Sequence, residues 1–143
     1  MCRAYRITAF LVGLVLVATA LPAGSEHTVY YRYVVLGFVK DARGKLVGGR
    51  PVEVVRDKTG LSYPTETDPQ GFFVVVVRLG DESAGETLTL RAGQAAMKIT
   101  ARFDPANHTD DRGTRVDLEG TKFVEHTAGF RPTLVRFLGN ETH

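Results

Sequence analysis

Oxygen-bearing side chains gather in one stretch of the sequence, residues 104–113. Asp104, Asp110 and Asp111 supply three carboxylates there, and Asn107 adds an amide oxygen. Carboxylate and amide oxygens are the ligands that calcium prefers. The same residue types also favour turns, because Asp and Asn side chains accept hydrogen bonds from nearby backbone N–H groups. A polar turn is the simpler interpretation, and a calcium loop formed by Asp104, Asn107, Asp110 and Asp111 is the alternative.

Other residues with catalytic potential are scattered along the chain. The sequence contains no His-Glu-x-x-His, no Gly-x-Ser-x-Gly, no Gly-rich phosphate loop and no Cys-x-x-Cys-His. Beyond residue 25 the serines are Ser62 and Ser83, and neither lies near a histidine in the sequence. His126 is typical of a surface histidine rather than a metal ligand. We therefore predict a protein without catalytic residues, bound metal or another cofactor.

The first 25 residues have the pattern of an export signal. Arg3 and Arg6 precede an uncharged stretch over residues 7–25, whose apolar centre is followed by Ala20, Ala23 and Ser25. We predict a signal peptide over residues 1–25, a periplasmic or extracellular location and no membrane span after cleavage. Retention of the segment as an anchor is the alternative, because about 20 apolar residues can cross a bilayer.

Removal of this segment changes the charge balance. The whole chain carries 18 Lys and Arg against 16 Asp and Glu, but two of the basic residues lie in the signal. The remainder is formally neutral, which argues against nucleic-acid binding, since that function needs a clustered positive face. The single cysteine, Cys2, also lies in the signal. The exported part must therefore fold without a disulfide, which favours a bacterial source.

Short runs rich in β-branched and aromatic residues predict strands and almost no helix. The expected strands cover residues 29–39, 52–57, 61–67, 72–79, 87–92, 95–103 and 115–119. Seven short strands separated by turn signals indicate an all-β sandwich. Residues 133–138 form an additional candidate strand or a docking tail.

The strand over residues 72–79 is apolar on both faces. If Phe73 faces the core, then Phe72, Val74 and Val76 project from the opposite face, where an exposed apolar patch indicates a partner surface. We predict an interface formed by these three residues together with Phe130 and Phe137. The alternative is that the C-terminal extension of the same chain covers them.

Two turn signatures carry a family resemblance. They read Gly37-x-Val39-x-Asp41-x-x-Gly44, continued by Gly49-x-Pro51-Val52-x-Val54, and then Thr67-Asp68-x-x-Gly71-x-Phe73. This pattern resembles that of carboxypeptidase regulatory-like domains. The resemblance implies a Greek-key sandwich of transthyretin-like type over residues 26–119, with core residues at Val39, Val54 and Phe73. Residues 120–143 form a C-terminal extension beyond it. It also implies a non-catalytic accessory or binding module.

Related sandwiches suggest two other functions. Intradiol dioxygenases hold iron with two Tyr and two His, and the exported part contains four of each. Three of the Tyr crowd one strand and two of the His lie near the termini, so we disfavour that site. A carbohydrate-binding face with Tyr31 and Tyr33 is a second alternative, although the chain has no Trp. The favoured interpretation is a non-catalytic binding or assembly subunit for another exported or membrane-associated protein.

Overall fold

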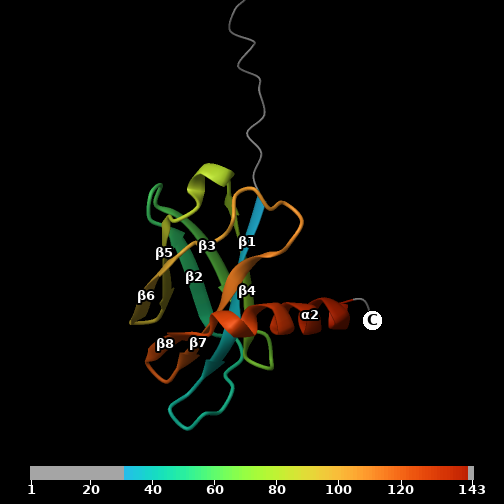
Figure 1. Ribbon diagram of the computed structural model, residues 1–143. Helices are drawn as coiled ribbons and strands as arrows, with labels where there is room; N and C mark the ends of the chain where they lie inside the picture. The colour runs from blue at the N-terminus through green and yellow to red at the C-terminus, as the bar shows by residue number, and fades with distance from the viewer. Residues whose placement is uncertain (1–30, 142–143) are drawn as a thin grey trace, which may run out of the picture.

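The computed structural model describes residues 31–141, which form two stacked β-sheets and one α-helix (Figure 1). One sheet has the order β4-β1-β7-β8 and the other has the order β3-β2-β5-β6. The strands of the first sheet are β4 (Phe72–Leu79), β1 (Tyr31–Lys40), β7 (Arg112–Glu119) and β8 (Lys122–Glu125). Those of the second are β3 (Leu61–Glu66), β2 (Pro51–Arg56), β5 (Thr87–Ala92) and β6 (Ala95–Thr100). The predicted β-sandwich is confirmed, with β8 as an eighth strand.

The main core lies between the two sheets and follows the period-2 alternation of the strands. Val52 and Val54 of β2, for example, point inward and are at most 2% exposed. Each strand presents alternate residues to this layer, as a sandwich requires. Val39, Val54 and Phe73, which the family resemblance placed in the core, are all buried there.

The two turn signatures contact each other at one end of the sandwich. Val39 N–H donates to the Gly71 carbonyl at 2.8 Å, and Gly49 N–H donates to the Thr67 carbonyl at 2.9 Å. Gly71 has φ +78°, and an added Cβ there would lie 3.0 Å from Leu46 Cβ. The left-handed backbone and the close contact both favour glycine at this position.

Gly37 belongs to the first signature but not to a turn, because it lies within β1. A Cβ at this position would collide with the backbone carbonyl of Val116 and would lie 3.1 Å from Asp117 Oδ1. Glycine is needed here because β7 approaches β1 closely, and not because the backbone turns.

The additional strand considered for residues 133–138 does not form, and a helix takes its place. Residues 133–138 belong to the helix α2 (Phe130–Glu141). Two single-turn helices precede it along the chain, η3 (Asp81–Ser83) and η4 (Thr127–Gly129). Phe130, Leu134 and Phe137 recur at helical spacing and pack on the outer face of the first sheet. Pro132 is tolerated because it lies in the first turn, where a backbone N–H has no partner within the helix.

Among residues 31–141, the helices are all too short or too polar to cross a membrane. The predicted signal peptide at residues 1–25 lies outside the described residues and remains a prediction.

Candidate functional site

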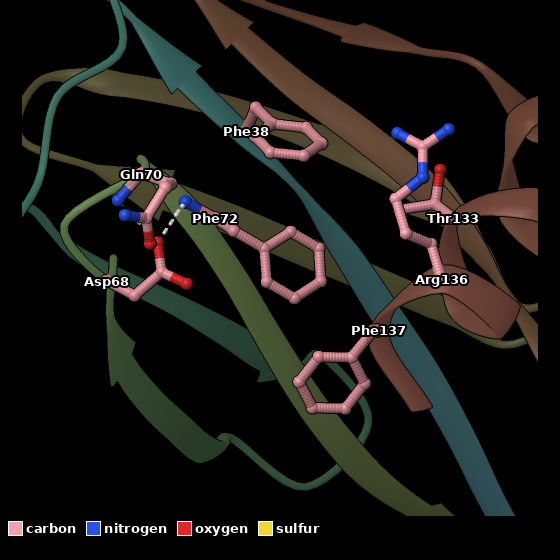
Figure 2. A pocket seen from close by; sticks show the side chains of 7 residues that line it. All are labelled: Phe38, Asp68, Gln70, Phe72, Thr133, Arg136 and Phe137. Carbon is pink, nitrogen blue, oxygen red and sulfur yellow. Dashed lines mark hydrogen bonds between the residues drawn. The ribbon is translucent and has the colours of Figure 1, made fainter. Parts of the chain in front are cut away.

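A cleft of about 470 Å³ opens where α2 crosses the first sheet. Its walls come from β1, β4, α2 and the turn before β4, as Figure 2 shows. The lining residues are Phe38, Asp68, Gln70, Phe72, Thr133, Arg136 and Phe137.

Three phenylalanine rings form the apolar part of this cleft. Phe38 and Phe72 are register partners on β1 and β4, and their ring centroids lie 5.2 Å apart at an interplanar angle of 53°. Phe137 of α2 lies 5.3 Å from Phe72 at 38°. These separations are those of favourable tilted aromatic contacts. The rings therefore hold one another in place and leave part of their surface facing the cleft.

Polar groups surround the rings. Asp68 Oδ1 accepts hydrogen bonds from Gln70 N–H and Phe72 N–H, both at 2.9 Å, so the turn fixes this carboxylate. Arg136 is exposed on α2, and no ion pair joins it to another residue of the described chain. The cleft thus combines apolar walls with an anion fixed at one edge and a cation on the helix.

Arg115 connects the sheet to the beginning of α2. Its Nε and Nη2 donate to the two oxygens of Asp117 at 3.0 and 2.9 Å, and its Nη1 donates to Thr133 Oγ1 at 3.1 Å. The guanidinium also lies over the Phe38 ring at 5.2 Å. The hydrogen bonds to Asp117 raise the pKa of Arg115 above its ordinary value. The fork to Asp117 holds the guanidinium in place, and its hydrogen bond to Thr133 then joins β7 to α2 beside Phe38.

A second group of side chains lies at the β7–β8 hairpin. His126 Nε2 is 3.5 Å from Glu119 Oε2 and 3.9 Å from Asp117 Oδ2. Asp117 is buried and accepts a further hydrogen bond from Phe38 N–H at 3.1 Å. Among the described residues, this is the one group of three or more His, Cys, Asp or Glu whose ligand atoms lie within 4.8 Å of one another.

The five residues predicted as a partner interface are only partly available. Phe130 is buried, and Phe72 and Val74 pack against the cluster that α2 covers. The extension, to which Phe130 itself belongs, therefore covers Phe72 and Val74 in part. Val76 stays 42% exposed, and Phe137 keeps access to the cleft. β4 is an edge strand of its sheet, and its outer face packs in part against the cluster that α2 covers.

The residues of the calcium hypothesis bond to one another or to the backbone. Asn107 Oδ1 accepts from Thr109 N–H and Asp110 N–H, while Asn107 Nδ2 donates to Asp110 Oδ2. Asp104 Oδ1 accepts from Ala106 N–H, and Asp111 lies 3.7 Å from Arg32. These contacts are those of a self-supporting polar turn, so calcium binding remains a prediction without structural support.

Among the described residues, the Tyr and His side chains that an iron site would need lie apart, whereas Tyr30, His27 and His143 lie outside the described residues. Tyr33 is buried between the sheets, and Tyr63 belongs to β3 of the opposite sheet. His108 contacts Asp81, whereas His126 contacts Glu119. Tyr33 is also unable to stack on a sugar, since it is 1% exposed.

The chain matches no protein-family model, and no curated protein is significantly similar to it. Several solved dioxygenase structures are similar in fold. Catechol 1,2-dioxygenase from Acinetobacter sp. ADP1 is 13% identical with a TM-score of 0.41, over 74% of this chain and 56% of that one. Chlorocatechol 1,2-dioxygenase from Pseudomonas putida is 14% identical with a TM-score of 0.40, over 71% and 62%.

A third similar structure is the dioxygenase domain of a dioxygenase carbohydrate-binding protein fusion from Streptomyces sp. SirexAA-E. It is 16% identical with a TM-score of 0.40, over 71% of this chain and 79% of that domain. The present chain thus spans 56% and 62% of the first two enzymes. At these identities the likeness concerns the fold alone.

These matches correct one sequence-based prediction. The prediction of a non-catalytic protein is contradicted, because the solved structures to which this chain is similar are those of enzymes. The likeness gives this chain no activity of its own, since fold does not fix function.

Proposed function

We propose that this protein is an exported binding subunit whose ligand site is the aromatic cleft between β1, β4 and α2. The observation that carries the proposal is the convergence of Phe38, Phe72 and Phe137 on one cleft, beside a guanidinium at Arg136 (Figure 2). The ligand is a segment of another exported or membrane-associated protein that presents an aromatic side chain next to a carboxylate.

The cleft has the dimensions and the lining of a binding site. A volume of about 470 Å³ lies within the range of ordinary ligand pockets, which combine mostly apolar walls with a few placed polar groups. Three phenylalanine rings supply the apolar walls. A further ring inserted among them would gain aromatic contacts of about 0.5–1.5 kcal/mol beyond its buried area.

The charged groups favour an anion near Arg136. Its guanidinium is planar and can bind a carboxylate through two parallel hydrogen bonds. Asp68, fixed by the turn before β4, disfavours a second anionic group at its own edge of the cleft. The ligand is therefore oriented, with its ring among the phenylalanines and its carboxylate toward α2.

A titration with N-acetylphenylalanine tests this proposal, because that probe carries one ring and one carboxylate. We expect backbone amide NMR shifts in the turn over residues 68–72 and in α2. Phe137→Ala should weaken binding about tenfold. Arg136→Gln should weaken binding of the acid but not of N-acetylphenylalanine amide, which lacks the carboxylate.

Arg131→Gln is the matched control, because Arg131 is also exposed on α2 but does not line the cleft. It should leave both affinities unchanged. Shifts that are absent from these two segments, or that persist unchanged in Phe137→Ala, would refute the cleft as the ligand site.

A further inference from the structure

We infer that Asp117, Glu119 and His126 form a binding site for a divalent transition-metal ion such as zinc. The site lies at the β7–β8 hairpin and uses none of the residues that line the aromatic cleft. The inference is therefore independent of the proposed function.

The distances suit a single ion. One nitrogen and two carboxylate oxygens lie within 4.8 Å of one another, and His126 Nε2 is 3.5 Å from Glu119 Oε2. Zinc binds such atoms at about 2.0–2.2 Å in tetrahedral geometry, which places neighbouring ligand atoms about 3.5 Å apart. Asp117 Oδ2, at 3.9 Å from His126 Nε2, needs only a small movement of the His126 ring to complete the set.

Asp117 is held in the orientation that a ligand needs. Its Oδ1 accepts from Phe38 N–H and Arg115 Nε, and its Oδ2 accepts from Arg115 Nη2. A carboxylate has about four acceptor positions, so one position on Oδ2 is left for an ion. The missing Cβ of Gly37 gives this carboxylate its space, since a Cβ there would lie 3.1 Å from Oδ1. These partners correspond to the hydrogen bonds that orient ligands in known metal sites.

The other two ligands are placed by the hairpin and remain accessible. His126 N–H donates to the Arg115 carbonyl at 2.7 Å, and Gly129 N–H donates to the His126 carbonyl at 2.8 Å. The backbone N–H and the carbonyl of His126 are therefore both fixed by hydrogen bonds. The side chains of His126 and Glu119 are 44% and 45% exposed, so an ion can reach them from solvent.

The charges and the donor types decide which ion binds. Arg115 and Lys40 line the same depression and partly offset the charge of the two carboxylates, so the imidazole nitrogen and not charge decides which divalent cation is preferred. An imidazole nitrogen combined with carboxylates favours zinc, copper or nickel over calcium or magnesium.

Calorimetry with zinc chloride on the metal-free protein tests the inference. We expect one ion per chain, and His126→Gln and Glu119→Gln should each weaken binding about tenfold or more. His108→Gln is the matched control, because His108 is also 44% exposed and lies 2.9 Å from a carboxylate of Asp81. Among the described residues, no third His, Cys, Asp or Glu joins His108 and Asp81 in a group that could hold a metal ion. This variant should bind zinc as the unchanged protein does.

Both test positions are half exposed, so the variants should fold, and circular dichroism checks that they do. NMR of the His126 ring gives a second measurement, with a shift of Nε2 on zinc addition. Absence of zinc binding, or equal binding by the His126→Gln and His108→Gln variants, would overturn the inference. Neither result bears on the cleft, whose test uses a different probe and different variants.

Discussion

The two apolar clusters of this molecule are built from the same strands but are closed in different ways. The inner cluster lies between two sheets, which cover it from both sides. The outer cluster lies on the opposite face of the first sheet and is closed by α2 alone, with Val34, Leu36, Phe130 and Leu134 buried in it (Figure 1). A single helix covers less area than a sheet, and the cleft opens at the edge of what α2 covers. Binding surface is available where the second layer is incomplete.

β1 serves both clusters. Tyr33 and Val35 point into the inner cluster, whereas Val34 and Leu36 point toward α2. A strand that is buried on both faces reads as an unbroken apolar run, because alternation disappears. This explains why the sequence of β1 predicted a strand but did not show that a second layer covers it.

The largest expected effect comes from a cavity in the inner cluster. Leu90→Ala removes a fully buried side chain between two sheets that cannot close around the gap. We expect a loss of about 3–4 kcal/mol in the free energy of unfolding. Urea unfolding followed by far-UV circular dichroism measures this loss. If Leu90→Ala lost less free energy of unfolding than Leu134→Ala in the outer cluster, the inner cluster would not be the more tightly closed of the two.

An equivalent change in the outer cluster should cost less and act locally. Leu134 belongs to α2, is 6% exposed and packs against the first sheet, so Leu134→Ala should cost about 2 kcal/mol in the free energy of unfolding. Hydrogen exchange should accelerate in α2 while the strands of the second sheet stay protected. Val135→Ala, at the next position but 65% exposed, is the control and should change stability by less than about 0.5 kcal/mol. Uniform acceleration across both sheets would show that α2 is not a separate layer.

This contrast also explains what could be predicted from the sequence. The inner cluster follows from alternation, as in Leu88 and Leu90, so the β-sandwich and most strand positions were found. The spacing of Phe130, Leu134 and Phe137 would have indicated a helix. The β-branched Thr133 and Val135 favour a strand instead, and Pro132 argues against a helix, although proline is harmless in a first helical turn.

The candidate sites were harder to find because they depend on long-range register. Phe38 and Phe72 are far apart in sequence and meet only because β1 pairs with β4. The sequence analysis named Phe72 and Phe137 as interface candidates and did not name Phe38 or Arg136, which line the same cleft. Asp117-x-Glu119 was a visible signal, since residues two apart share a strand face. Its relation to His126 depends on the β7–β8 hairpin, which the sequence did not reveal.

The smallest expected effect is the pH dependence of stability that comes from Tyr33, a buried residue of the inner cluster. Burial raises the pKa of Tyr33 to about 12 from an ordinary value of 10.0. The unfolded chain therefore releases the Tyr33 proton at a lower pH than the folded chain does. The contribution of protonated Tyr33 to the stability of the fold is complete below about pH 10 and is lost as the pH rises toward about 12. At pH 11 the loss attributable to Tyr33 should be about 1 kcal/mol relative to pH 9.

Tyr33→Phe separates this effect from general alkaline unfolding, because Phe keeps the ring and has no proton to release. The variant should lose about 1 kcal/mol at neutral pH, because it lacks the hydrogen bond between the Tyr33 hydroxyl and the Arg102 backbone. Between pH 9 and pH 11, however, its stability should fall less steeply than that of the unchanged protein. Urea unfolding at both pH values measures the two slopes. If the stability of both proteins fell equally between pH 9 and pH 11, the Tyr33 hydroxyl would be reached by solvent. The inner cluster would then be no more tightly closed than the outer cluster.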